Sequence, residues 1–244
     1  MSILRNVVEN FFLLFNAKVI HCDTYKRLIE LETDVESLTK KSRSQLMQDL
    51  FVLYELNFKR NGYFVDFGAT NGVSLSNSYL LEKEFEWKGI LAEPAKCWHD
   101  DLRKNRVNHI ETNCVWRDSI SVLSFNEVDN PEFSTISDYN ASDVHTNQRN
   151  AGHSYEVNTI SLIDLLDKYA APKVIDYLSI DAEGSEYDIL KNFDFDKYKF
   201  RVITVEHNYT SNRELIYNLL IKNGYSRKYL GFSKWDDWYV NLDL

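Results

Sequence analysis

The stretch that decides the expected fold is Tyr63-Phe64-Val65-Asp66-Phe67-Gly68-Ala69-Thr70-Asn71-Gly72. Its first half, Tyr63–Phe67, is a short apolar run that predicts a buried strand. The two glycines that follow, four residues apart, let the backbone turn tightly and approach a ligand closely. Asp66 occupies the position of the first glycine in the G-x-G-x-x-G motif, so the sequence disfavours a dinucleotide pyrophosphate cradle.

Carboxylates at the ends of two predicted strands indicate a different cofactor. Asp66 followed by G-x-x-x-G is typical of the loop that wraps the methionine end of S-adenosylmethionine, although such turns are also common structural features. Glu93 follows the apolar run Lys88–Ala92 and lies 21 residues beyond Gly72. A carboxylate there can accept hydrogen bonds from both ribose hydroxyls, or it can stabilise a helix that starts at Pro94. Together the two features favour S-adenosylmethionine.

Beyond this stretch, apolar runs alternate with helical patterns. Strands are predicted at residues 63–67, 88–92, 109–115, 122–128, 174–180, 201–205, 225–230 and 237–242. Helices are predicted at residues 45–58, 76–85, 94–105, 161–169, 183–192 and 212–222, and residues 129–153 are polar without a period. This rhythm predicts an α/β fold with a mostly parallel seven-stranded sheet, helices on both faces and an antiparallel edge formed by the last strands.

Residues 1–43 form a predicted N-terminal helical extension, and residues 44–244 form the predicted main domain. Leu28, Leu31, Val35 and Leu38 make an apolar stripe at helical spacing. Such a stripe could pair with a second copy and give a homodimer. An amphipathic helix that lies on its own domain is the favoured alternative, because the stripe covers only about two heptads.

The composition excludes several classes of protein. With 44% hydrophobic residues and only 3 prolines and 8 glycines, the chain is neither disordered nor collagenous. No apolar run approaches the ~20 residues of a membrane span. Three cysteines without paired spacing are typical of a reducing compartment, so the sequence predicts a cytoplasmic protein. The formal net charge of −9 disfavours nucleic acid as a partner.

Polar residues also follow two strands near the predicted centre of the sheet. The segment Leu178–Glu186 places Asp181 and Glu183 at a strand-to-helix turn, and Glu206 and His207 follow the next strand. Ligands bind at the carboxyl ends of the strands in such sheets. Acidic residues also stabilise helix N-termini, and that structural role is expected for Glu186 at the end of the segment. For the other four residues, convergence of two strand ends predicts a catalytic role.

With these motifs, the chain resembles the FkbM-type S-adenosylmethionine-dependent methyltransferases over about residues 44–240. The matching motifs, in the family's order, are Ser44-Gln45 with Gln48-Asp49, Phe64–Ser74, Trp87–Pro94, Leu178–Glu186 and Glu206-His207. The resemblance implies a Rossmann-like class I methyltransferase fold and O-methylation of a sugar or polyketide hydroxyl. Ala92 departs from the family's pattern, in which a β-branched residue usually precedes the Glu.

The resemblance also implies roles for individual residues. Carried over position by position, it implies that Asp66, Gly68, Gly72 and Glu93 hold the cofactor and that Asp181 faces the methyl group. Further candidates for cofactor binding are Gln48, Ala69, Asn71, Pro94, Asn113 and Cys114. Of these, Cys114 is expected to pack near the adenine.

Methyl transfer to a hydroxyl requires a group that removes the hydroxyl proton. The candidates for this catalytic role are Asp181, Glu183, Glu206 and His207. A divalent cation such as Mg²⁺ or Mn²⁺, held by Asp181 with Glu206, His207 and Asn208, is an alternative, and no metal ligand is assigned. The expected acceptor is a small molecule or a glycan. A protein or peptide methyltransferase, or a non-catalytic scaffold that keeps the cofactor pocket, are the alternative functions.

The polar stretch Asn140–His153 is predicted to be a mobile substrate lid, because long insertions in compact domains are commonly functional. It contains His145, Arg149 and His153, whose side chains can hydrogen-bond a polyhydroxyl or anionic acceptor. A plain surface loop is the alternative.

Overall fold

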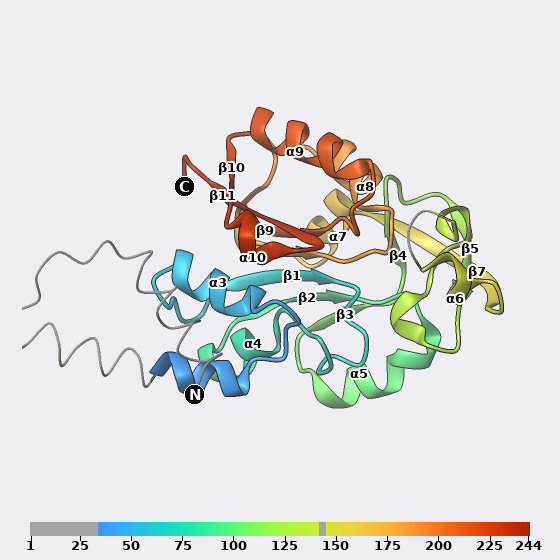
Figure 1. Ribbon diagram of the computed structural model, residues 1–244, viewed down its shortest axis with the longest axis horizontal. Coiled ribbons are helices and arrows are strands. Elements are labelled where there is room, and N and C mark those ends of the chain that lie inside the picture. The colour runs from blue at the N-terminus through green and yellow to red at the C-terminus, as the bar shows by residue number, and fades with distance from the viewer. Residues whose placement is uncertain (1–33, 142–144) are drawn as a thin grey trace, which may run out of the picture. The chain divides into compact units, whose positions relative to one another are not determined.

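The computed structural model describes residues 34–141 and 145–244 (Figure 1). The chain divides into two units, Met1–Ser42 and Arg43–Leu244, and each is described by itself. In the first unit, residues 34–41 are helical, and Lys40 donates to Glu36 one turn earlier at 2.8 Å. The rest of the predicted extension lies outside the described residues, so a homodimer through it stays a prediction. Within the described ranges, no helix has the length and apolar character needed to cross a bilayer.

The second unit is built on a seven-stranded sheet with the order β10-β11-β9-β8-β1-β2-β3. Its strands are β1 (Tyr63–Phe67), β2 (Lys88–Ala92), β3 (His109–Glu111), β8 (Val174–Ile180), β9 (Lys199–Glu206), β10 (Tyr225–Lys228) and β11 (Asp236–Asn241). Five neighbouring strands, β9, β8, β1, β2 and β3, run parallel, and β11 is antiparallel to both of its neighbours. The predicted seven-stranded, mostly parallel sheet with an antiparallel edge is confirmed.

Helices cover both faces of this sheet (Figure 1). The helices are α3 (Gln48–Glu55), α4 (Tyr79–Phe85), α5 (His99–Asn105), α7 (Leu162–Lys168), α8 (Glu186–Lys191), α9 (Asn212–Lys222) and α10 (Leu230–Ser233). Side chains of β1 alternate between the faces: Val65 and Phe67 join one apolar core, while Phe64 lies under the Arg106 guanidinium on the other side. Figure 1 shows α4 and α5 on one side and α8 and α9 on the other.

The strand register brings the predicted site residues to one edge of the sheet. Phe67 at the end of β1 pairs with Ala92 of β2 and with Ile180 of β8, and Ile180 pairs in turn with Val205 of β9. The residues that follow these positions therefore leave the sheet at nearly the same level. At this edge β1 lies between β2 and β8, so the strand order reverses at β1. Ligands of open α/β sheets usually bind at such a reversal.

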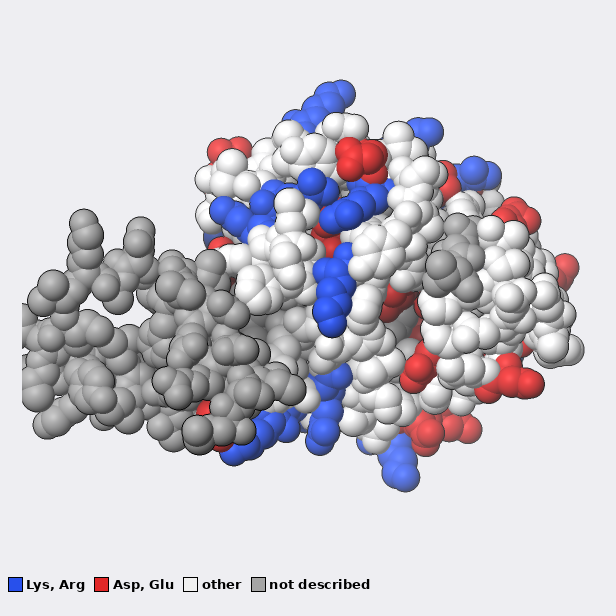
Figure 2. Space-filling view, viewed as in Figure 1, with Lys and Arg blue, Asp and Glu red and all other residues white. Residues whose placement is uncertain are grey.

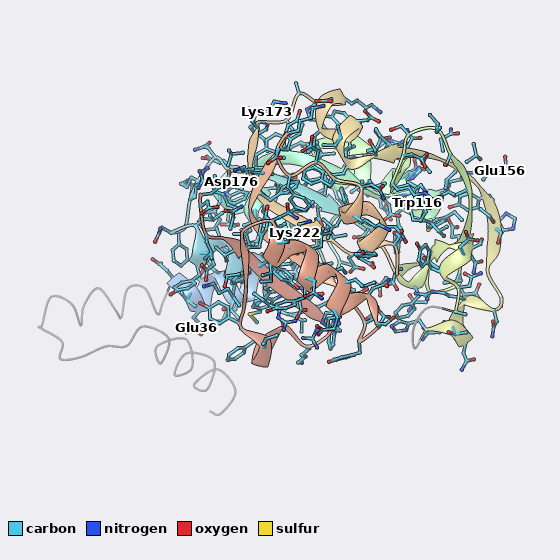
Figure 3. All side chains as sticks on the ribbon, turned by 90° about the horizontal axis from the view of Figure 1, so that it is seen from above. Glu36, Trp116, Glu156, Lys173, Asp176 and Lys222 are labelled. Carbon is cyan, nitrogen blue, oxygen red and sulfur yellow. The ribbon has the colours of Figure 1, made fainter. Side chains whose placement is uncertain are left out.

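A second sheet, in the order β4-β7-β5-β6, was not predicted. Its strands are β4 (Cys114–Trp116), β5 (Val122–Glu127), β6 (Thr135–Ile136) and β7 (His153–Ser161). The prediction of one strand over 109–115 is wrong, because the backbone N–H groups of Thr112 and Asn113 both donate to Glu111 Oε1 at 3.0 Å and break the ladder. Seen from above, Trp116 of β4 and Glu156 of β7 lie on this second sheet, away from Asp176 of β8 (Figure 3).

The expectation that residues 129–153 lack regular structure is also wrong. The stretch contains the short helices η2 (Pro131–Phe133), η3 (Ser137–Tyr139) and α6 (Thr146–Arg149), the strand β6 and the start of β7. The pairing of β7 with β5 is antiparallel, from Val122 opposite Asn158 to Glu127 opposite His153. Residues 142–144 of the predicted lid lie outside the described residues.

Several helices begin later than the sequence predicts, for local reasons. The helix α8 starts at Glu186 because Glu183 and Gly184 adopt positive φ angles of 54° and 118°, which no right-handed helix contains. The Glu186 carboxylate then accepts the N–H groups of Ala182 and Gly184, at 3.1 and 2.9 Å. This contact is the structural role expected for that residue.

Candidate active site

A cavity of about 450 Å³ opens at the carboxyl edge of the main sheet. Six of the residues that line it are acidic, namely Asp66, Glu93, Glu132, Asp181, Glu183 and Glu206. No lysine or arginine is found among its described lining residues. Figure 2 shows acidic side chains in a recess on one face of the molecule. The local potential in such a cavity is negative and favours ligands that carry positive charge.

Gly68 lets the loop after β1 approach the end of β8. Its φ is +72°, and a Cβ there would lie 2.1 Å from the backbone oxygen of Asp181. The N–H groups of Gly68 and Ala69 both donate to Ala92 O, at 3.1 and 3.3 Å. Only glycine fits this close approach, and Gly68 lines the cavity as predicted from its position in the motif.

Glu93 connects the end of β2 with the same loop. Its Oε2 accepts the Thr70 N–H and its Oε1 accepts the Ala95 N–H, both at 2.8 Å. Burial raises the pKa of Glu93 to about 7, although these two hydrogen bonds act in the opposite direction. A carboxylate has about four lone-pair sites, so each oxygen keeps acceptor capacity toward the cavity that it lines.

Asp66 is buried at the base of the cavity. The Ser78 hydroxyl donates to its Oδ2. Burial raises the pKa of Asp66, while the Ser78 hydrogen bond and the nearby Arg106 charge lower it. The carboxylate is therefore held in one orientation beneath the loop.

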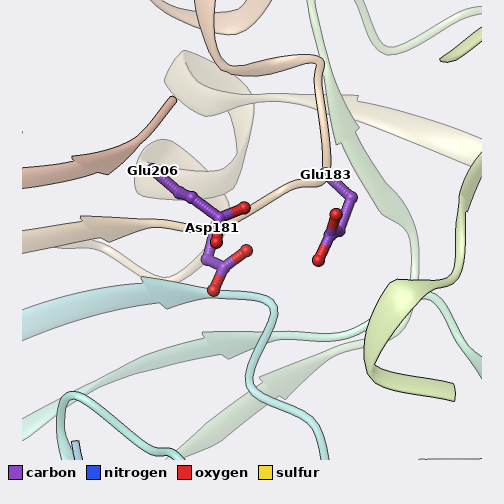
Figure 4. Close-up of side chains that lie close together, drawn as sticks. All are labelled: Asp181, Glu183 and Glu206. Carbon is purple, nitrogen blue, oxygen red and sulfur yellow. The ribbon is translucent and has the colours of Figure 1, made fainter. Parts of the chain in front are cut away.

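Asp181, Glu183 and Glu206 converge at the ends of β8 and β9 (Figure 4). One carboxylate oxygen from each lies within 4.8 Å of the others. The carboxyl groups of Asp181 and Glu206 are close enough that the ionisation of each affects the other. Desolvation, together with the Asp236 charge, raises the pKa of Asp181 to about 7, and desolvation and Asp181 raise the pKa of Glu206 well above its usual range.

Glu183 has a different partner from the other two carboxylates. Arg149 Nη2 donates to its Oε2 at 2.6 Å, and the Arg149 side chain is 0% exposed. Thr135 donates to the Glu183 backbone oxygen at 2.8 Å. The prediction that Arg149 offers its side chain to an acceptor is therefore wrong, because that side chain is committed to Glu183. His145 does line the cavity, whereas His153 does not.

His207 lies outside the cavity that Glu206 lines. Its ring is buried, its Nδ1 accepts the Tyr209 N–H at 3.0 Å, and its Nε2 is 3.7 Å from Asp237 Oδ1. Asp237 is in turn paired with Arg213 and Arg227. The His207 ring therefore does not line the cavity, and its catalytic role stays a prediction.

The predicted cofactor residues fall into two groups. Those that line the cavity are Asp66, Gly68, Glu93, Pro94, Cys114 and Asp181. Those that do not are Gln48, Ala69, Asn71, Gly72 and Asn113.

Members of the second group have structural contacts instead. Gln48 donates to Asp236 at 2.6 Å, and Asn71 Oδ1 accepts the N–H groups of Val73 and Ser74 at 2.9 and 2.8 Å. These side chains support the cavity from outside its wall.

Sequence reasoning missed the apolar wall of the cavity. Phe125 and Ile136 belong to β5 and β6 of the second sheet, and Trp235 and Tyr209 lie in loops beside the end of β9. The alternation of buried Val157 with exposed neighbours along β7 was a usable signal for the second sheet.

A family model described as the methyltransferase FkbM domain matches residues 66–230, which is more than half of the chain. The chain belongs to the FkbM methyltransferase family. No curated protein sequence matches it.

Three solved structures that are similar to this FkbM-family chain are distant from it in sequence. The methyltransferase FkbM from Methylobacillus flagellatus is 13% identical with a TM-score of 0.46, and the match covers 87% of this chain and 60% of that protein. The precorrin-6y C5,15-methyltransferase from Geobacter metallireducens is 13% identical, with coverages of 79% and 84% and a TM-score of 0.41. The methyltransferase domain of METTL16 is 14% identical, with coverages of 80% and 66% and a TM-score of 0.44.

Proposed function

We propose that this protein is an S-adenosylmethionine-dependent O-methyltransferase that acts on a hydroxyl of a sugar, a glycan or a polyketide-like small molecule. The observation that carries the proposal is the pair of adjacent carboxyl groups, Asp181 and Glu206, in a cavity at the carboxyl edge of the sheet. Membership of the FkbM family supports the class of reaction.

The residues of the cavity fit the proposed cofactor. S-adenosylmethionine carries a sulfonium and an ammonium group, and both suit a cavity whose described lining has acidic residues and no basic ones. Gly68 allows the loop after β1 to lie against the end of β8, where a Cβ would clash with the backbone oxygen of Asp181. Glu93 offers free lone pairs where a ribose would present two hydroxyl donors.

In the proposed reaction the cofactor supplies an electrophilic methyl group when bound. The chain must orient the acceptor hydroxyl and take its proton. We assign the proton transfer to Asp181, because a base with a pKa of about 7 is both deprotonated and basic near neutral pH. Glu206 lies beside this base, with one carboxylate oxygen within 4.8 Å of an Asp181 oxygen. Glu183, paired with Arg149, lines the same cavity and is placed to accept a hydrogen bond from a neighbouring hydroxyl.

The acidic lining of the cavity also restricts the chemical class of the proposed acceptor. Phosphate groups would be repelled by the cavity, so phosphorylated sugars and nucleic acids fit it poorly. A neutral polyhydroxyl molecule fits both the charge and the array of hydrogen-bond acceptors. A protein or peptide acceptor remains the second enzyme candidate, and a scaffold without catalysis would have no use for the carboxylates of Asp181 and Glu206.

A divalent cation is the alternative to direct base catalysis. The cluster that could hold it consists of Asp181, Glu183 and Glu206, whereas the predicted ligand His207 faces Asp237. Two of the three carboxylates already have a partner, because Arg149 bonds Glu183 and Asn208 donates to Glu206 at 2.8 Å. We therefore expect full activity in excess EDTA. A loss of activity that Mg²⁺ or Mn²⁺ restores would favour the cation.

The proposed function is tested in two stages. Native mass spectrometry of protein purified from cells should show bound S-adenosylhomocysteine or S-adenosylmethionine. A panel of neutral sugars, aminosugars, phosphosugars and peptides should then give a methylated product only with a hydroxyl acceptor. Asp181→Asn is the control that should keep the cofactor and lose transfer. Absence of cofactor binding, or methylation at nitrogen alone, would overturn the proposal.

A further inference from the structure

We infer that Arg106 is a positioning residue that holds the cofactor loop, residues 68–78, in its binding shape. Arg106 directly follows α5, its side chain is 0% exposed, and it is absent from the lining of the cavity. The inference rests on the proposed function, since it assumes that the cavity binds S-adenosylmethionine.

Arg106 contacts the cofactor loop at three separate points. Its Nη1 donates to Gly72 O at 3.1 Å and to Ser76 Oγ at 3.2 Å, and its Nη2 donates to Ser78 Oγ at 3.0 Å. The planar guanidinium has five N–H donors in a fixed fork, so one side chain can fix three groups at once. Lysine, with a single nitrogen, cannot reproduce this arrangement.

One of these contacts belongs to a chain of hydrogen bonds that ends at a residue of the cavity wall. The Ser78 hydroxyl accepts from Arg106 and donates its own proton to Asp66, which lines the cavity. Because the hydroxyl has one proton, the Arg106 contact fixes the direction in which it points. Ser76, the second hydroxyl partner, also lines the cavity.

The same side chain explains the second glycine of the motif. A Cβ on Gly72 would lie 2.6 Å from Arg106 Cγ and 2.8 Å from Leu102 Cδ1. Gly72 therefore makes room for the aliphatic stem of Arg106 and leaves its backbone oxygen within reach of the guanidinium. Its φ of +79° is an additional reason for glycine at this position.

The charge of Arg106 is balanced outside the loop. Its Nε donates to Glu82 Oε2 at 2.6 Å, and Asn108 donates to the same oxygen at 2.6 Å. Glu82 lies on α4 and is absent from both the cavity lining and the cofactor loop. The side chains of the ion pair thus differ in one respect: the Arg106 guanidinium donates to the loop, whereas the Glu82 carboxylate bonds residues outside the loop.

This difference supplies the test. Affinity for S-adenosylhomocysteine is measured by calorimetry and thermal stability by melting, for the wild type, Arg106→Met and Glu82→Gln. Both variants break the buried ion pair, so both should have a lower Tm. The amide of the Glu82→Gln variant still offers an oxygen to Arg106, so this variant should keep the wild-type affinity within about twofold, whereas Arg106→Met should bind about tenfold more weakly.

Two further variants keep the test decisive if Arg106→Met does not fold. Ser78→Ala preserves the ion pair and removes the link to Asp66, so it should weaken binding while lowering the Tm less than Arg106→Met does. Arg106→Lys keeps the charge and should recover only part of the affinity. The inference would be overturned if Arg106→Met or Ser78→Ala bound S-adenosylhomocysteine as tightly as the wild type does. It would also be overturned if Glu82→Gln lost as much affinity as Arg106→Met. A wild type that does not bind the ligand would instead overturn the proposed function.

Discussion

The carboxyl groups of Asp181 and Glu206 meet across the ends of two adjacent parallel strands, with one oxygen of each within 4.8 Å of the other. Ile180 and Val205 pair in the register of β8 and β9, so the next residue of each strand reaches the same cavity. Two carboxyl groups this close cannot both ionise easily, and their protons leave in two steps that belong to the pair. The ionisation of this pair should affect both the rate of methyl transfer and the stability of the fold, and the two effects can be measured separately.

The rate of methyl transfer should rise with pH through about 7. Desolvation raises the pKa of Asp181 to about 7, so this proposed base is protonated and inactive at lower pH. Asp181→Asn should reduce kcat by about 10²–10⁴-fold, the usual contribution of a positioned base. The measurement is a pH profile of kcat for the wild type and for the variant. A wild-type profile that is flat from pH 5 to 9 would contradict the role of Asp181.

Asp181→Asn should also stabilise the ligand-free protein at high pH. A carboxyl group whose folded pKa is raised stabilises the fold fully below its unfolded pKa, and this contribution is lost as pH rises through the folded value. The window therefore runs from about pH 4 to about pH 7. The Tm of the variant minus that of the wild type should increase across this window, by about 2–4 °C for each kcal/mol. A constant difference would mean that Asp181 does not titrate there.

Glu93→Ala should weaken the binding of S-adenosylhomocysteine by roughly 10- to 150-fold, since a hydrogen bond to a charged group contributes about 1.5–3 kcal/mol. It also leaves the N–H groups of Thr70 and Ala95 without their acceptor. The matched control is Glu127→Gln. Glu127 raises the pKa of Glu93 but bonds Tyr155 and is absent from the cavity lining. Calorimetry that finds wild-type affinity for Glu93→Ala would remove Glu93 from the cofactor site.

Gly68→Ala should abolish cofactor binding and lower the Tm, whereas Gly231→Ala should do neither. The alanine Cβ at position 68 would lie 2.1 Å from Asp181 O, with a φ of +72° that costs a non-glycine residue about 1–2 kcal/mol. No atom lies within 4 Å of the equivalent Cβ at Gly231, where alanine is expected to be neutral or stabilising by about 0.4–1 kcal/mol. The measurements are melting curves and S-adenosylhomocysteine affinity, and similar behaviour of the two variants would contradict the proposed contact.

The main sheet could be predicted from the sequence because buried parallel strands are continuous apolar runs with sharp ends. Predicted strands 63–67, 88–92 and 174–180 coincide with β1, β2 and β8. The second sheet was missed because β6 has only two residues and the strand β7 follows a polar stretch that hides its alternation. Short strands of mixed polarity are defined by their partners, and the partner of β7 lies about 30 residues earlier in the chain.

The sequence by itself determined which strand ends carry carboxylates, because side chains after a parallel strand must leave at the carboxyl edge of the sheet. Only the tertiary structure decided which of them face the cavity. Adjacent residues of an extended chain point in opposite directions, so Glu206 reaches the cavity while His207 turns to Asp237. The roles of Arg106 and Arg149 could not be predicted from the sequence either. Each buried guanidinium bonds partners that lie far away in the sequence, and only packing brings them within hydrogen-bonding distance.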